Sequence, residues 1–331
     1  MSKQPFSGIY AQHLKEFVAL KQSLGYKYTR ASVCLDDFDR FTQTRGEHTL
    51  GISRELSDAF CAKRPYESNS TRILRVSTLR VFSAYLCNLG IRSFIPPPCT
   101  CGRGAYIPYV FSRDEIKKVF SACDTLVSGR KCKHLNLFAM PALLRFLYAT
   151  GIRIGEAVSL KSRDVDLVGH HAVIRDSKNG KERLVPLSDS LVLVCKEYVQ
   201  HRDALPVGCL SGFFFTTLNG KQCSHESVRW WFRKILQDAA IPYQGRSAGP
   251  RIHSLRHSFA THSLAQVAET GKDLYSLLPH LSAFLGHESL NSTNAYIRLT
   301  AEMYPALIHG FDQEVILGMF PEINFNNDET E

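Results

Sequence analysis

A histidine and a tyrosine near the end of the chain are the first residues whose types and spacing suggest chemistry. His287 follows Leu285-Gly286, and Tyr296 lies nine residues after His287. The chain is basic and also contains His253-Ser254-Leu255-Arg256, so an imidazole near a phenol suggests a tyrosine nucleophile directed at a phosphate. Taken alone, the pair is explained more simply by a helix boundary and a core aromatic. The other charged residues must therefore decide between the two interpretations.

Two arginines far apart in the sequence are candidates for binding that phosphate. Arg153 follows a predicted helix end, where its side chain can leave the core. His253 and Arg256 are three residues apart, so a helix places both on one face. Each guanidinium can donate two hydrogen bonds to non-bridging phosphate oxygens, in a geometry that lysine does not offer. His257 and His262 fall elsewhere around the same helix and are interpreted as structural.

Composition limits the class of protein. The chain has 331 residues, enough for two domains, with 44% hydrophobic residues and a net charge of +9. The charge favours a polyanionic partner, and nucleic acid is preferred over a membrane surface because no basic amphipathic helix stands out. Neither an apolar signal core nor a membrane-spanning run is found, so we expect a cytoplasmic, nucleoid-associated protein. The ten cysteines are scattered and predicted to be reduced, with no metal site among them.

A proline- and glycine-rich seam divides the chain. Residues 95–104 contain three prolines and two glycines, which favour extended or turn conformations. Before this seam, apolar residues recur at helical spacing in four segments: 10–24, 31–41, 54–62 and 71–89. The last segment also carries Arg72, Arg75 and Arg80, which form either a solvated face or contacts to DNA phosphates.

Helices are also expected to dominate after the seam. Ser112 and Glu115 have the spacing of a capping box, which marks the start of a helix. A longer helix is expected over residues 135–149, and further helices are expected from residue 188 onward. The predicted fold class is therefore mainly α with a small antiparallel β-sheet: a helical bundle followed by an α+β domain.

The sheet is predicted from two strand-like runs, residues 172–174 and 183–187. The segment between them contains Asn179-Gly180, a pair that tolerates the positive φ angles of a tight hairpin turn. This turn places Lys178 and Lys181 at an exposed hairpin tip.

Four motifs in this order resemble those of the tyrosine recombinase (phage integrase) family, which includes Xer-like recombinases. The motifs are Gly151-Ile152-Arg153-Ile154-Gly155-Glu156-Ala157, Ser177-Lys178-Asn179-Gly180-Lys181-Glu182-Arg183, His253-Ser254-Leu255-Arg256-His257, and Leu285-Gly286-His287 followed by Thr293 and Tyr296. The resemblance covers most of the chain. It implies a helical core-binding domain in residues 1–94, an interdomain linker in 95–108, and a catalytic domain in 109–331 with a C-terminal tail from about residue 300.

The resemblance also implies a reaction that uses neither a metal nor a cofactor. A tyrosine attacks the scissile phosphate, which gives a 3′-phosphotyrosyl bond and a free 5′-hydroxyl. The implied catalytic residues are Tyr296 as nucleophile, Arg153, Arg256 and His287 as phosphate ligands, His253 as assistant in proton transfer, and Lys178 as the acid for the leaving oxygen. Glu156 lies three residues after Arg153 and is placed to orient its guanidinium. Lys181 stays the alternative to Lys178.

The implied partner is double-stranded DNA with inverted-repeat core sites. The family assembles on such DNA as a tetrameric synapse, and its C-terminal tail contacts a neighbouring protomer; accessory DNA-bending or directionality proteins are further expected partners. The biological role stays open between integration or excision, transposition of a mobile element, and dimer resolution. Type IB topoisomerase-like relaxation and a catalytically silent DNA-binding protein are the alternative functions. The helical first part of the chain favours DNA recombination over DNA relaxation. The complete set of catalytic residue types argues against a catalytically silent protein.

Overall fold

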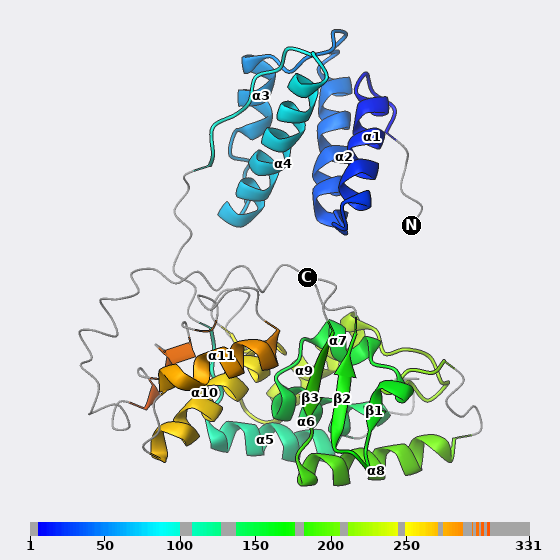
Figure 1. Cartoon of the computed structure of the whole chain (residues 1–331), viewed down its shortest axis with the longest axis vertical. Helices are drawn as coiled ribbons and strands as arrows, with labels where there is room; N and C mark the ends of the chain where they lie inside the picture. The colour runs from blue at the N-terminus through cyan, green and yellow to red at the C-terminus, as the bar shows by residue number, and fades with distance from the viewer. Residues whose placement is uncertain are drawn as a thin grey trace. The chain divides into compact units, whose positions relative to one another are not determined.

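The computed structural model describes two compact units of the chain, Met1–Gly104 and Ala105–Glu331. Figure 1 shows the helices of both units and the small sheet of the second. The described residues are 6–99, 108–126, 137–175, 182–205, 211–243, 249–270 and 274–286, with Thr293, Tyr296, Ile297, Leu299, Thr300, Met303 and Tyr304 beyond them.

The first unit is a bundle of helices, as predicted. Its described helices are α1 (Ala11–Ser23), α2 (Thr29–Thr44), α3 (Arg54–Cys61) and α4 (Asn69–Asn88). Ser53 and Ser68 begin α3 and α4, because each side-chain oxygen accepts a hydrogen bond from an amide of the first turn. Aromatic rings fill the core between the helices: the ring of Phe38 lies 5.4 Å from that of Tyr10 and 6.2 Å from that of Phe82.

The second unit is mainly helical. Its described elements are α5 (Arg113–Asp124), the 3-10 turn η1 (Leu137–Ala139), α6 (Met140–Thr150), α7 (Ile154–Ser159), the 3-10 turn η2 (Ser162–Asp164), β1 (Val165–Asp166), β2 (His171–Ile174), β3 (Arg183–Pro186), α8 (Asp189–Asp203), α9 (His225–Asp238), α10 (Ser254–Glu269) and α11 (Leu274–Leu285). The capping box at Ser112 and Glu115 is confirmed, since each side chain bonds the other residue's amide. The prediction of a mainly α fold with a small antiparallel sheet is also confirmed.

The sheet has the strand order β1-β2-β3, and both pairs are antiparallel. Ile174 pairs with Arg183, so the two predicted strand runs do form the arms of a hairpin. Strand β1 was not predicted, because it contains only two residues and is defined by its pairing with β2. The hairpin tip with Lys178 and Lys181 lies outside the described residues.

Helix α6 is the central support of the candidate site. It packs against α5, α8 and α10, and α10 packs in turn against α11 (Figure 1). The predicted helix over 135–149 begins later than expected: residues 137–139 form a 3-10 turn, and the α-helix starts at Met140 with Pro141 in its first turn. Proline suits this position because its missing amide would have no partner there.

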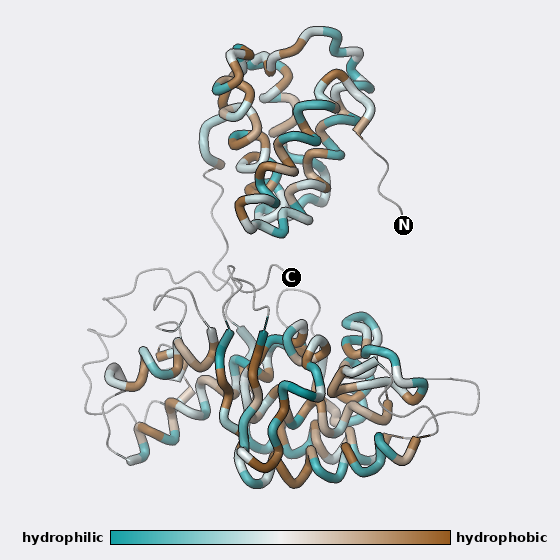
Figure 2. The backbone as a smooth tube through the Cα atoms, turned by 45° about the vertical axis from the view of Figure 1, so that its right-hand side comes forward, coloured by the Kyte–Doolittle hydropathy of each residue, from teal (hydrophilic) through white to brown (hydrophobic). Residues whose placement is uncertain are grey.

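Hydrophobic and hydrophilic stretches alternate along the helices of both units (Figure 2). This is the pattern of helices that bury one face and expose the other. Within the described part of the chain, none of the helices has the length and hydrophobicity to cross a membrane.

Gly151 ends α6 and turns the chain toward Arg153. Its φ of 59° lies in the left-handed region, and its amide bonds the carbonyl of Leu147. A Cβ at this position would overlap Cδ1 of Phe259 and would lie 2.9 Å from Cδ2 of Leu285. The turn therefore lets α6 approach α10 and α11 more closely than any larger residue would allow.

We expect Gly151→Ala to destabilise the protein more than Gly212→Ala. Both glycines have positive φ, so each substitution carries strain of about 1–2 kcal/mol. Only Gly151 is enclosed, since nothing lies within 4 Å of a Cβ at Gly212. Overpacking should add roughly 1–3 kcal/mol at Gly151. Urea unfolding measures the difference, and equal midpoints for the two variants would contradict the close approach of the three helices.

Candidate active site

Arg153 and Glu156 form a buried pair at the start of α7. Arg153 is 4% exposed and Glu156 is 8% exposed. The Glu156 carboxylate accepts hydrogen bonds from the Arg153 amide at 3.0 Å and from its Nη1 at 3.3 Å. A carboxylate that receives an amide from the first turn of a helix also interacts favourably with the helix dipole. The contact expected between Glu156 and the guanidinium of Arg153 is present.

Arg256 connects two segments that are distant in sequence. Its guanidinium donates from Nη1 to the carbonyl of Gly151 at 2.9 Å and from Nη2 to the carbonyl of Leu285 at 3.0 Å. The side chain is buried, with the residue 1% exposed. Gly151 lies two residues before Arg153, and Leu285 ends α11. Arg256 therefore joins the turn that precedes Arg153 to the end of α11, which precedes His287 in the sequence.

His253 and Tyr296 are linked through His257. His253 is the residue before α10, and its ring lies 4.8 Å from that of His257. Nδ1 of His257 lies 3.1 Å from the hydroxyl of Tyr296, which is 1% exposed. In this arrangement the phenol lies among the buried apolar residues of α10 and α11, shielded from solvent.

The contact between His257 and Tyr296 was not predicted from the sequence. His257 follows His253 by four residues, and this spacing places both imidazoles on one side of α10. That signal was available in the sequence. His262 has the expected structural contact, since its Nδ1 lies 2.9 Å from the hydroxyl of Tyr148.

Arg183, the first residue of β3, is a part of the site that the sequence reasoning missed. It donates from Nη1 to Oε1 of Glu156 at 3.0 Å and from Nη2 to Oε2 at 2.6 Å. Its Nε also donates to the carbonyl of Phe284 at 3.0 Å. Arg183 stands at the end of the hairpin motif, but nothing in the local pattern indicates partners on α7 and α11.

The surroundings of Glu156 keep its carboxyl group ionised. Burial by itself raises the pKa, but the hydrogen bond and charge of Arg183, the amide of Arg153 and the charge of Arg256 outweigh it. The pKa of Glu156 therefore lies below its ordinary value. Because the folded pKa is lower than the unfolded one, this group stabilises the fold above about pH 4 and loses that contribution as the pH falls.

We expect Glu156→Gln to lower stability at pH 7 by roughly 3–5 kcal/mol, because it leaves buried guanidinium groups without their counter-charge. The variant should also lose less stability than the wild type between pH 7 and pH 3. Urea unfolding at a series of pH values measures both effects. Asp114→Asn is the matched control, since Asp114 forms an exposed pair with Lys117 that contributes little. Parallel pH profiles for Glu156→Gln and the wild type would contradict this assignment.

Three of the expected site residues, Lys178, Lys181 and His287, lie outside the described residues. The described base of the hairpin is closed by Arg175, whose Nη1 lies 2.8 Å from Oε1 of Glu182. The choice between the two lysines stays a prediction.

The three arginines proposed for DNA contact all have partners within the first unit. Arg75 is 2% exposed and forms a bidentate pair with Glu67, at 3.0 and 2.7 Å. Arg72 donates to the carbonyl of Cys61, and Arg80 donates to that of Pro96. The structure thus places Arg75 in the interior of the unit rather than on a solvated face. Contact with DNA phosphates stays a prediction for all three.

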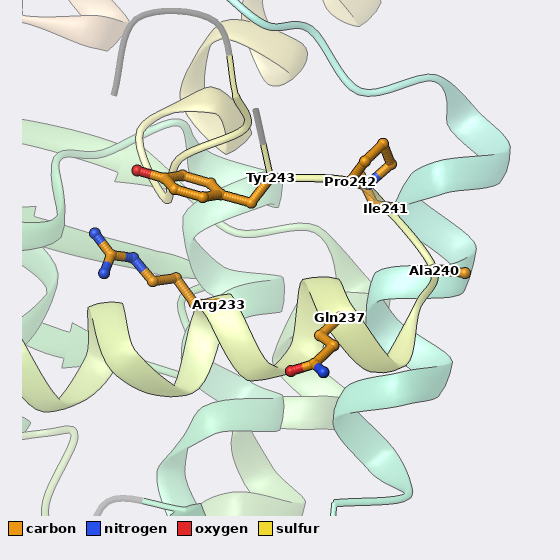
Figure 3. A pocket seen from close by; sticks show the side chains of 6 residues that line it. All are labelled: Arg233, Gln237, Ala240, Ile241, Pro242 and Tyr243. Atoms are coloured by element: carbon orange, nitrogen blue, oxygen red, sulfur yellow. The ribbon is translucent and has the colours of Figure 1, made fainter. Parts of the chain in front are cut away.

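A hollow of about 380 Å³ lies beside the end of α9. Figure 3 shows the side chain of Arg233 directed toward the ring of Tyr243, with their guanidinium-to-ring distance at 5.2 Å. None of the candidate site residues lines this hollow. Across the described ranges, no cluster of three or more His, Cys, Asp or Glu side chains could hold a metal ion.

Comparison with known proteins identifies the family. The model of the phage integrase family matches residues 110–303. The putative integrase/recombinase y4rB of Sinorhizobium fredii (strain NBRC 101917 / NGR234) is 30% identical over 301 residues, which cover 89% of this chain and 94% of the relative. The tyrosine recombinase XerD of Rhizobium meliloti (strain 1021) is 29% identical over 284 residues, which cover 83% of this chain and 85% of the relative.

Solved structures share the fold. The XerH site-specific recombinase in its post-cleavage complex with palindromic difH substrate aligns with a TM-score of 0.61 at 19% identity, over 86% of this chain and 79% of that one. A lambda integrase (75-356) dimer bound to a COC′ core site gives a TM-score of 0.59 at 16% identity, over 86% and 94% of the two chains. The chain therefore belongs to the phage integrase family and is a tyrosine recombinase, a DNA breaking-rejoining enzyme.

Proposed function

We propose that this recombinase cleaves each DNA strand through a covalent bond between Tyr296 and a 3′-phosphate. The observation that carries the proposal is the contact network of the site: Arg256 bonds the turn beside Arg153, and α10 presents His257 to the hydroxyl of Tyr296. Two guanidinium groups and a phenol from distant segments are thus held in one part of the second unit.

The proposed reaction conserves the phosphodiester bond energy. The phenol oxygen of Tyr296 forms a bond to phosphorus while the bond from phosphorus to the 5′-oxygen breaks. Lys178, with Lys181 as the alternative, gives a proton to the 5′-oxygen, and His253 assists removal of the phenol proton. A 5′-hydroxyl from a partner strand then attacks the phosphotyrosine and rejoins the DNA without ATP.

The arginines have a defined task in this reaction. A tyrosine hydroxyl is a weak nucleophile at neutral pH because its reference pKa is about 10. Arg153, Arg256 and His287 would stabilise the negative charge that develops on the phosphate oxygens. By analogy with oxyanion-hole donors, each guanidinium is worth on the order of 3 kcal/mol in the transition state.

The proposed partner is duplex DNA with inverted-repeat core sites, on which the protein assembles as a tetramer. Support comes from related folds: one lambda integrase structure is a tetramer bound to a Holliday junction, and the Tn1549 transposon integrase is in complex with transposon right end DNA. Integration or excision, transposition and dimer resolution all use the same strand chemistry. DNA relaxation of the topoisomerase IB type is the second candidate, because it needs a similar set of residues. Strand transfer between two DNA molecules distinguishes recombination from relaxation.

Tyr296→Phe should abolish covalent capture of DNA and leave binding intact. The test incubates the protein with a nicked duplex that carries its target site, and detects the protein-DNA adduct on a denaturing gel. Tyr304→Phe is the matched control and should still form the adduct. An adduct that survives in Tyr296→Phe would show that another residue is the nucleophile.

Removal of residues from about 312 onward should spare DNA binding by a monomer but weaken higher-order complexes. The physical reason is the apolar character of this segment, which contains Val315, Ile316, Leu317, Met319 and Phe320. The segment lies outside the described residues, and we propose that it packs on a neighbouring protomer. Native gel shifts at increasing protein concentration measure assembly, and unchanged complexes in the truncated protein would refute the proposed docking.

A further inference from the structure

Arg183 contacts two segments of the candidate site at once. One end of its guanidinium forms the bidentate pair with Glu156, and its Nε reaches the carbonyl of Phe284. The side chain is 10% exposed. The contacts cross 27 residues to Glu156 and 101 residues to Phe284, so they link β3 to α7 and α11.

The contact between Arg183 and Glu156 also affects Arg153, because both arginines bind the same carboxylate. Both oxygens of the Glu156 carboxylate are used by Arg183, while Oε2 also accepts the amide of Arg153 and Oε1 accepts its Nη1. A bidentate guanidinium fixes the plane of the carboxylate as well as its position. Arg183 therefore determines how Glu156 is presented to Arg153.

The contact between Arg183 and the carbonyl of Phe284 holds the end of α11. The last carbonyls of a helix have no partner within the helix and attract cations. Arg183 binds the carbonyl of Phe284, and Arg256 binds that of Leu285. The next residue, Gly286, has a φ of 70°, and a Cβ there would lie only 2.9 Å from Nη1 of Arg183. The guanidinium thus packs against the backbone from which His287 follows.

We propose that Arg183 is a positioning residue for DNA cleavage. It aligns Glu156, and through it Arg153, with the end of α11 that precedes His287. It acts through these groups and does not bind the phosphate itself. The proposal rests on the proposed function, because it assumes that Arg153 stabilises charge on the scissile phosphate.

The first test measures cleavage and binding separately in the full-length protein. Arg183→Gln should slow single-turnover formation of the covalent adduct on a nicked target duplex by about 10- to 100-fold, because small displacements of a positioned group have effects of this size. The Kd for the same duplex should change by less than about threefold, since Arg183 makes no DNA contact in this scheme. Arg183→Lys should recover part of the rate, because it keeps the charge but not the forked geometry.

Arg145→Gln is the matched control. Arg145 forms a bidentate pair with Asp124, at 2.9 and 2.6 Å, on the same unit but without a described contact to the site residues. Its loss should leave the cleavage rate at the wild-type value. A similar loss of rate in Arg145→Gln and Arg183→Gln would reduce Arg183 to a general stabiliser of the fold and overturn the proposal.

The second test uses a duplex with a methylphosphonate at the scissile position, which removes one negative charge from the phosphate. If Arg183 acts through charge stabilisation by Arg153, the rate ratio of wild type to Arg183→Gln should be smaller on this substrate than on the normal one. A merely structural defect would give the same ratio on both, and that result would overturn the proposal. A wild-type rate in both Arg183 variants would overturn it as well. Failure of the unaltered chain to form any adduct would instead overturn the proposed function, and this inference with it.

Discussion

The candidate active site depends on the hydrogen bonds that the buried carboxylate of Glu156 accepts from two arginines. An isolated carboxylate in a protein interior would take up a proton, because burial penalises its charged form. The guanidinium groups of Arg153 and Arg183 prevent this by donating hydrogen bonds to both of its oxygens. In return the carboxylate allows the two cations to lie close together without repelling each other. The strand β3 and the helix α7 are thereby joined by an ion pair in addition to the apolar core that both elements line.

Backbone carbonyls complete the framework around this carboxylate. Arg256 donates hydrogen bonds to the carbonyls of Gly151 and Leu285, and Arg183 donates one to the carbonyl of Phe284. Each of these oxygens lies at or just past a helix end, where it would otherwise need water. Arg256, which faces a phosphate in the proposed reaction, and Arg183, which does not, both connect segments of the chain that are distant in sequence. A change in one of them alters the fold and the chemistry together, which explains why binding and cleavage must be measured separately.

The sequence predicts those features that are determined by short-range patterns. The capping box at Ser112 needs only a residue three positions later, and the helices of both units follow from their apolar spacing. Contacts between distant segments were not predictable in the same way. Arg183 begins a strand, and its partner Glu156 is 27 residues away, so no local pattern connects them. Arg75 has the spacing of a surface residue, and only the fold brings it into a buried pair with Glu67. His257 is an intermediate case, because its spacing from His253 was visible but its contact with Tyr296 was not.

The burial of Tyr296 has a consequence for the reaction proposed above. In the proposed reaction Tyr296 is the nucleophile. Because the residue is 1% exposed and its hydroxyl lies 3.1 Å from Nδ1 of His257, the phenol has to leave this contact before it can reach a phosphate. In this scheme the binding of DNA supplies the free energy to repack the apolar cluster around the phenol. In that scheme the choice of target depends on which DNA sequences bind tightly enough to supply this free energy.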